Sequence, residues 1–216
     1  MRNCYRVGCH YTNLGFIPMR VWLIIAVLLL SACTESALSP LKPGDVIVAF
    51  GDSLTAGKGV SQDKAYPVVL SELTGFTVIN AGISGETTEE GLDRLPDVLD
   101  RENPSLLILF EGGNDILRNY DLSETKQNLD AMINIAKEQG VQVALVGLPR
   151  KQLLSSTAGF YNELADEHKL PIQDKIVASL LRKPAMKSDS VHFNAKGYRA
   201  LAQSIAQMLR EAGALE

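Results

Sequence analysis

Two residues near the carboxyl end of the chain have types and spacing suited to proton transfer. Asp189 precedes His192 by three residues, so a single turn of chain can bring the carboxylate to the imidazole. A carboxylate that accepts the Nδ1–H of a histidine fixes the ring tautomer and supports the imidazolium. The other ring nitrogen can then act as a base for a hydroxyl within hydrogen-bond reach. The pair is typical of a site for nucleophilic catalysis.

Ser53 is the hydroxyl that the sequence places at a reactive position. The apolar run Val46–Phe50 is typical of a strand buried on both faces, and Gly51 and Asp52 lead from it to Ser53. In open α/β sheets, ligands bind at the carboxyl ends of the strands. The alternative is that Gly51-Asp52-Ser53 is only a turn, because all three residue types favour turns.

Of the histidines, His192 is the candidate base by elimination. His168 lies at the end of a predicted helix, where a cation stabilises the C-terminal dipole, so we expect a structural role for it. His10 belongs to an amino-terminal segment that is expected to be removed.

The elements that must position these residues alternate between strands and helices. Further strands are expected at 76–79, 106–110, 141–146 and 170–172, and helices are expected to begin near Tyr66, Thr87, Asp121, Ser155, Ile176 and Asn194. This alternation predicts a doubly wound, flavodoxin-like α/β domain over residues 45–216. We expect a three-layer sandwich around a parallel five-stranded sheet with strand order 2-1-3-4-5.

Glycine-containing loops follow the first three predicted strands, at 51–57, 80–86 and 111–116. In the order 2-1-3 these strands are neighbours, so their loops surround one crevice. Glycines allow backbone N–H groups to approach a bound ligand closely. The sequence therefore predicts one site built from three loops together with the Asp189–His192 segment.

Four sequence blocks in this order resemble those of the GDSL (SGNH) hydrolases, and most of all the bacterial arylesterase, thioesterase I and lysophospholipase group. The blocks are Gly51-Asp52-Ser53-Leu54, Gly85, Gly112-Gly113-Asn114-Asp115 and Asp189-x-x-His192. The resemblance covers residues 45–212 without a large insertion. It implies a serine esterase that forms an acyl-enzyme intermediate and needs neither a metal nor a cofactor.

The same resemblance implies a role for each matching residue. Ser53 is the nucleophile, His192 the general base and then acid, and Asp189 the residue that orients it. The oxyanion hole is implied to consist of the backbone N–H groups of Ser53 and Gly85 and the side-chain amide of Asn114. Neutral, preorganised donors of this kind are what a tetrahedral oxyanion requires.

Two aspartates are expected to have structural roles, and one further loop is expected to border the substrate. Asp52 and Asp115 are expected to tie down their own turns through backbone hydrogen bonds. The loop at 147–154 should border the acyl pocket, although its Arg150 and Lys151 match no family role. No segment is long enough for a lid domain, which favours soluble esters, thioesters or lysophospholipids over triacylglycerol droplets.

The amino-terminal segment predicts a lipid anchor. Val21–Ala32 is an apolar run preceded by Arg20, too short to span a bilayer but suited to a signal peptide. Leu30-Ser31-Ala32-Cys33 resembles the lipobox of bacterial lipoproteins, with cleavage before Cys33. We therefore expect a leader at 1–32, of which 1–18 is an upstream misannotation if Met19 is the true start, and a Ser/Pro/Lys-rich tether at 33–44.

Charge and cysteine content limit the partners and the location. The net charge is −4 without a basic run, so no nucleic-acid partner is expected. After processing, Cys33 is the only cysteine, which leaves neither a disulfide nor a cysteine-based metal site. The expected location is the bacterial cell envelope, with the lipid on Cys33 in the outer membrane and the domain on the periplasmic side.

Three functions are compatible with these observations. The first is a serine esterase that acts on aryl or short-acyl esters, thioesters or lysophospholipids. The second is a carbohydrate O-deacetylase, because the same site can remove acetyl groups. The third is a non-catalytic envelope lipoprotein, which has no reason to retain every catalytic position.

Overall fold

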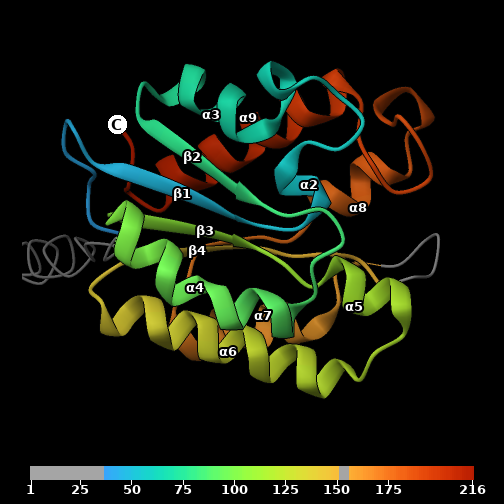
Figure 1. The fold of residues 1–216 in the computed structure, drawn as a ribbon. Helices are drawn as coiled ribbons and strands as arrows, with labels where there is room; N and C mark the ends of the chain where they lie inside the picture. Colours follow the sequence, from blue (N-terminus) through green and yellow to red (C-terminus); the bar gives the residue numbers. More distant parts are fainter. Residues whose placement is uncertain (1–36, 151–155) are drawn as a thin grey trace, which may run out of the picture. The chain divides into compact units, whose positions relative to one another are not determined.

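A parallel five-stranded sheet forms the centre of the domain (Figure 1). The computed structural model describes residues 37–150 and 156–216. The strands lie in the order β2-β1-β3-β4-β5, and every neighbouring pair is parallel, so the predicted fold class and strand order are confirmed. Their bounds are Val46–Gly51 for β1, Thr77–Gly82 for β2, Leu106–Phe110 for β3, Gln142–Val146 for β4 and Ile172–Gln173 for β5.

The central strands are continuous apolar runs because both of their faces are covered. β3 is buried along its whole length, and in β1 and β4 only the first residue is partly exposed. Helices α3 (Tyr66–Thr74) and α9 (Ala195–Glu211) pack together on one face of the sheet, and α4 (Thr88–Glu102), α6 (Leu122–Glu138) and α7 (Gly159–His168) cover the other (Figure 1). The remaining helices in the described residues are α2 (Ser53–Ala56), α5 (Gly113–Arg118) and α8 (Ile176–Leu181), with short 3₁₀ turns at Gln62–Lys64 and Pro184–Met186.

Side-chain caps fix the helices that begin beside the carboxyl edge of the sheet. Thr87 and Glu90 form a reciprocal capping box at the start of α4. Asn194 caps α9, where its side-chain oxygen accepts hydrogen bonds from the N–H groups of Lys196 and Gly197. These caps hold the loops that precede α4 and α9 in fixed positions.

Several boundaries differ from those expected. α2 and α5 occupy stretches that the sequence predicts as loops, because each is a short helix beginning at a polar turn and lacks the apolar periodicity of a longer one. β2 continues to Gly82 rather than ending at 79, since its last residues pair with β1 as far as Gly51. The expected helix start at Ser155 and part of the 147–154 loop lie outside the described residues.

Part of the predicted tether packs against the domain. Leu38 is buried and its N–H donates to the carbonyl of Ala212, just beyond α9, and Leu41 donates to Ala214. Burial of the Leu38 side chain removes apolar surface from water and so favours this contact. The contact was not predicted from the sequence, because the residues around Leu38 are mainly polar. Within residues 37–150 and 156–216, no helix has the length and apolar character needed to cross a membrane.

Candidate active site

Ser53 lies at the first residue of α2, immediately beyond the carboxyl end of β1. Asp52 caps this short helix: its Oδ1 accepts the N–H of Leu54 at 2.9 Å, and its carbonyl accepts the N–H groups of Thr55 and Ala56. Gly51 is required before the turn, because a Cβ there would lie 2.0 Å from the carbonyl oxygen of Phe110. Asp52 therefore has the structural role predicted for it: its hydrogen bonds to the start of α2 hold Ser53 at the edge of the sheet.

His192 lies between Ser53 and Asp189. Its Nε2 is 3.0 Å from Ser53 Oγ, and its Nδ1 is 2.7 Å from Asp189 Oδ2. The other carboxylate oxygen of Asp189 accepts the N–H groups of Val191 and His192, at 2.9 and 2.8 Å. The loop is closed by an antiparallel bridge between Lys187 and Phe193. The fold thus joins a serine and a histidine that are 139 residues apart in the sequence.

Hydrogen bonds keep Asp189 ionised beside the imidazole. Partial burial by itself would raise the pKa of Asp189. The N–H of Val191, the His192 imidazole and the N–H of His192 outweigh it and lower the pKa to about 2. An ionised carboxylate at this position can support a positive charge on His192.

The two backbone N–H groups that the sequence predicts for the oxyanion hole have no acceptor within the described part of the chain. As the first residue of α2, Ser53 has no intrahelical acceptor for its N–H, and no other described residue accepts from it. The N–H of Gly85, in the loop after β2, likewise donates to none of the described residues. Gly85 has φ of +91°, and its carbonyl oxygen accepts from Arg118 at 2.8 Å.

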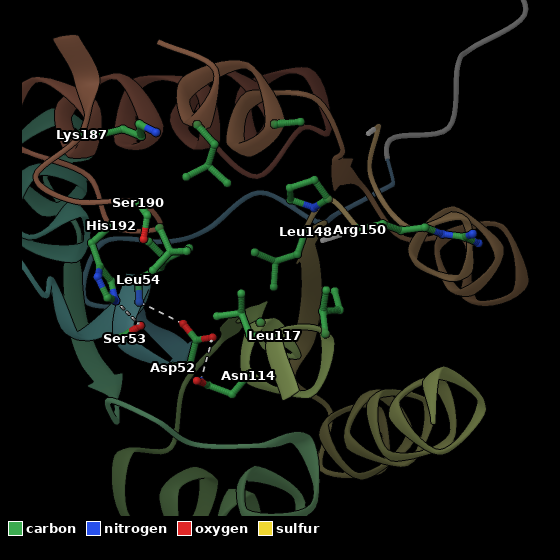
Figure 2. A pocket seen from close by; sticks show the side chains of 16 residues that line it. Asp52, Ser53, Leu54, Asn114, Leu117, Leu148, Arg150, Lys187, Ser190 and His192 are labelled. Carbon is green, nitrogen blue, oxygen red and sulfur yellow. Dashed lines mark hydrogen bonds between the residues drawn. The ribbon is translucent and has the colours of Figure 1, made fainter. Parts of the chain in front are cut away.

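Asn114 reaches the same place from the second residue of α5. Its Nδ2 donates to the carbonyl of Glu86 at 2.8 Å and lies 3.4 Å from Asp52 Oδ2 (Figure 2). The short bond fixes the amide, while the long one leaves the second amide proton weakly held. Asn114 and Ser53 both line the cavity described below.

A cavity of about 360 Å³ opens beside these residues (Figure 2). Asp52, Ser53, Asn114 and His192 line it, and Lys187 and Arg150 provide its basic side chains. The rest of the lining is mainly apolar and consists of Leu54, Gly113, Ile116, Leu117, Leu148, Pro149, Ala178, Leu181 and Val191, together with the polar Ser190. The cavity therefore offers an apolar surface next to a serine–histidine pair.

Buried carboxyl groups behind the serine were not predicted from the sequence. Asp52, Glu86, Glu111 and Asp115 are each at most 5% exposed. Burial, opposed by the Leu54 N–H and reinforced by the charges of Glu86 and Asp115, raises the pKa of Asp52 to about 7. The only signal of this cluster in the sequence is the position of Glu111 directly after an apolar strand.

Two of these carboxyl groups fasten neighbouring segments to α4: Glu86 the loop that precedes it, and Asp115 the short helix α5. Arg94 forms a two-point ion pair with Glu86, donates to the carbonyl of Ala81 at 2.8 Å and lies over the ring of Phe50. Asp115 was expected to tie down its own turn, but its carboxylate instead accepts from the N–H and hydroxyl of Thr88, 27 residues away. The connection is long-range and could not be seen from local turn preferences.

His168 lies outside the cavity. Its Nε2 is 2.6 Å from Asp130 Oδ1, so the ring joins the end of α7 to α6. Among the residues that the structure describes, no group of three or more His, Cys, Asp or Glu side chains is arranged to hold a metal ion.

Known esterases resemble this chain in sequence and in structure. The chain is 28% identical over 202 residues to the arylesterase of Vibrio mimicus, covering 88% of this chain and 98% of that protein. It is 30% identical to thioesterase 1/protease 1/lysophospholipase L1 of Escherichia coli (strain K12), covering 77% and 84%. The crystal structure of AlinE4, an SGNH-hydrolase family esterase, superposes with a TM-score of 0.62 at 31% identity, covering 80% and 98%.

A family model matches residues 49–200, which include every block of the predicted site. The matched region contains Ser53, His192, the end of β1 and all of strands β2 to β5, so the sequence match covers the residues that form the site. The chain therefore belongs to the GDSL-like lipase/acylhydrolase family, a family of serine ester hydrolases.

Proposed function

We propose that this protein hydrolyses carboxylic esters and thioesters through an acyl-enzyme intermediate on Ser53. The observation that carries the proposal is the position of His192, with Nε2 at 3.0 Å from Ser53 Oγ and Nδ1 at 2.7 Å from Asp189. A serine hydroxyl needs a base within hydrogen-bond reach to act as a nucleophile, and this arrangement provides one.

The reaction proceeds in two halves. His192 Nε2 takes the hydroxyl proton as Ser53 Oγ attacks the ester carbonyl carbon, and the resulting imidazolium is stabilised by Asp189. The oxyanion is held by the N–H groups of Ser53 and Gly85 and by the Asn114 amide. His192 then returns the proton to the departing alcohol or thiol, and a water molecule, activated in the same way, releases the acid and restores Ser53.

The cavity supports a substrate with an apolar acyl group. Most of its lining is apolar, and it begins at the serine. Lys187, on the loop that carries His192, has no ion-pair partner among the described residues and can attract an anionic leaving group. Aryl or short-acyl esters, thioesters and lysophospholipids fit this surface, and the named relatives are esterases of these kinds. Neither the apolar lining nor the relatives favour a carbohydrate O-deacetylase or a non-catalytic lipoprotein.

The test is active-site labelling combined with a substrate panel. A fluorophosphonate probe should label the wild-type protein at Ser53, and Ser53→Ala should abolish labelling and turnover while leaving the melting temperature almost unchanged. A panel of p-nitrophenyl esters of increasing chain length, a thioester and a lysophospholipid would then rank the substrates. Undiminished labelling of Ser53→Ala would refute the proposal.

For the location, we propose that Cys33 carries a lipid that anchors the domain to the outer membrane of a bacterial cell envelope, on the periplasmic side. The support is the apolar run before Cys33 and the Leu30-Ser31-Ala32-Cys33 block. The protein should fractionate with membranes, and Cys33→Ala should release it to the soluble fraction. A Cys33→Ala protein that remains with the membrane would count against the anchor.

A further inference from the structure

Glu111 is a fully buried carboxyl group that the proposed reaction does not use. It directly follows β3 and is 0% exposed. Its side chain packs over Gly91 of α4, where a Cβ would lie 3.6 Å from Glu111 Cγ. The hydroxyl of Tyr161 donates to its main-chain carbonyl at 2.7 Å. An acidic side chain sealed in this way is costly unless it is neutral or well paired.

Glu111 receives fewer hydrogen bonds than the other buried carboxyl groups around it. Glu86 is paired with Arg94, and Asp115 accepts from two groups of Thr88. Glu111 accepts one bond, from the N–H of Gly112 to Oε2 at 2.8 Å, and no donor among the described residues reaches Oε1. The least supported of these groups is the one expected to hold a proton.

We propose that Glu111 is protonated at neutral pH and, by donating to the Glu86 carboxylate, positions the loop that holds Asn114 beside Ser53. Two carboxyl groups can share a hydrogen bond only when one of them carries a proton. The main-chain carbonyl of Glu86 is in turn the acceptor that fixes Asn114, at 2.8 Å. The proposal rests on the proposed function of Ser53 and Asn114 and makes Glu111 a positioning residue for it.

The electrostatic surroundings agree with this arrangement. Burial, the charge of Asp52 and hydrogen bonding to Glu86 raise the pKa of Glu111 well above its ordinary value, against the lowering effect of the Gly112 N–H. Asp115 from α5 and Tyr161 from α7 also face the cluster, and Arg94 is the cation bonded to it.

Ionisation of Glu111 therefore adds a negative charge beside Asp52 and Glu86. It also removes the proton from the bond to Glu86. Both effects push the Glu86 loop away, and Asn114 moves with it. The oxyanion hole then loses a positioned donor as the pH rises.

The test compares Glu111→Gln with Glu111→Leu. The glutamine side chain keeps a neutral donor toward Glu86 and an acceptor for Gly112, so kcat of Glu111→Gln should stay within about threefold of wild type. The leucine side chain keeps neither, so Glu111→Leu should lower kcat about fivefold to tenfold with little change in KM. As the pH is raised, kcat of the wild type should fall relative to that of Glu111→Gln, because the amide does not ionise. Glu138→Gln, at an exposed position on α6, is the matched control.

Infrared difference spectra test the proton without reference to turnover. Because Asp52 is itself partly protonated at neutral pH, the band is read from differences between proteins. The spectrum of wild type minus Glu111→Gln should show a protonated-carboxyl C=O band, and that of wild type minus Glu138→Gln should not. A missing band, equal losses of kcat in the two Glu111 variants, or full kcat in Glu111→Leu would each overturn the proposal. If the band is present but the wild type and all variants are inactive, the proposed function is contradicted instead. If Glu111→Leu fails to fold, the infrared spectrum and the pH dependence of kcat in Glu111→Gln still test the role of Glu111.

Discussion

Replacing Asp52 with asparagine should remove a stability loss that the wild-type protein suffers as the pH rises. Asp52 is 3% exposed, and burial raises the pKa of its carboxyl from 3.8 to about 7. The folded protein therefore holds the Asp52 proton more tightly than the unfolded chain does. The contribution of this group to stability is complete below pH 3.8, falls as the pH rises toward 7 and levels off above it.

The size of the effect follows from the shift. About 3 pKa units at about 1.4 kcal/mol each give a loss of about 4 kcal/mol in the free energy of unfolding above pH 7. Between pH 5 and pH 8 the same two pKa values give about 2.5 kcal/mol. An asparagine at this position keeps the oxygen that caps Leu54 N–H but does not ionise, so Asp52→Asn should gain about that much on the wild type over this interval.

Urea unfolding at pH 5 and pH 8 measures the change directly. The new amide faces Asn114 Nδ2, 3.4 Å from Asp52 Oδ2, and any cost of this contact is the same at both pH values. The difference between the two pH values therefore isolates the titration. Asp97→Asn, on the exposed face of α4, provides the matched baseline. A stability difference between Asp52→Asn and wild type that is equal at pH 5 and pH 8 would refute the reasoning.

Three further predictions concern catalysis and processing. Asn114→Ala should lower kcat by roughly 10²–10³, about 2.7–4 kcal/mol, with little change in KM or melting temperature; an unchanged kcat would leave the oxyanion hole to the two backbone donors. His192→Ala should abolish p-nitrophenyl ester turnover, whereas His168→Ala should keep activity within a few-fold and lose about 1 kcal/mol of stability because its contact with Asp130 is removed; equal activity losses would contradict the assignment. If the proposed leader is removed, the processed protein should show no tryptophan emission, because Trp22 is the only tryptophan and lies in that segment; emission from purified mature protein would show that the segment is retained.

The sequence was sufficient for the sheet because each central strand contains a run of at least four apolar residues, and a glycine follows within two residues of the end of that run. Buried strands were predicted from the two apolar runs Val46–Phe50 and Leu106–Phe110. Because these strands are neighbours in the sheet, the loops that follow them lie side by side. The pairing of Asp189 with His192 was likewise visible, because it depends on a separation of three residues.

The missed features depend on contacts between distant segments. α2 and α5 are too short to show a periodic pattern, and Asp115 binds Thr88 rather than its own turn. The burial of Glu111 depends on how α4 crosses the sheet, which no local pattern encodes. Residue types predict the elements and the reacting groups, whereas the carboxyl network is decided by packing.

The contact of Leu38 with Ala212 sets the point at which a proposed anchor would meet the folded domain. Leu38 joins the domain at the C-terminal end of α9, while the N-terminal end of the same 17-residue helix follows His192 and lies about 25 Å away. Cys33 precedes Leu38 by five positions, so an extended chain between a lipid on Cys33 and Leu38 would reach about 17 Å. The point where such an anchor meets the folded domain and the catalytic histidine would therefore lie at opposite ends of one helix.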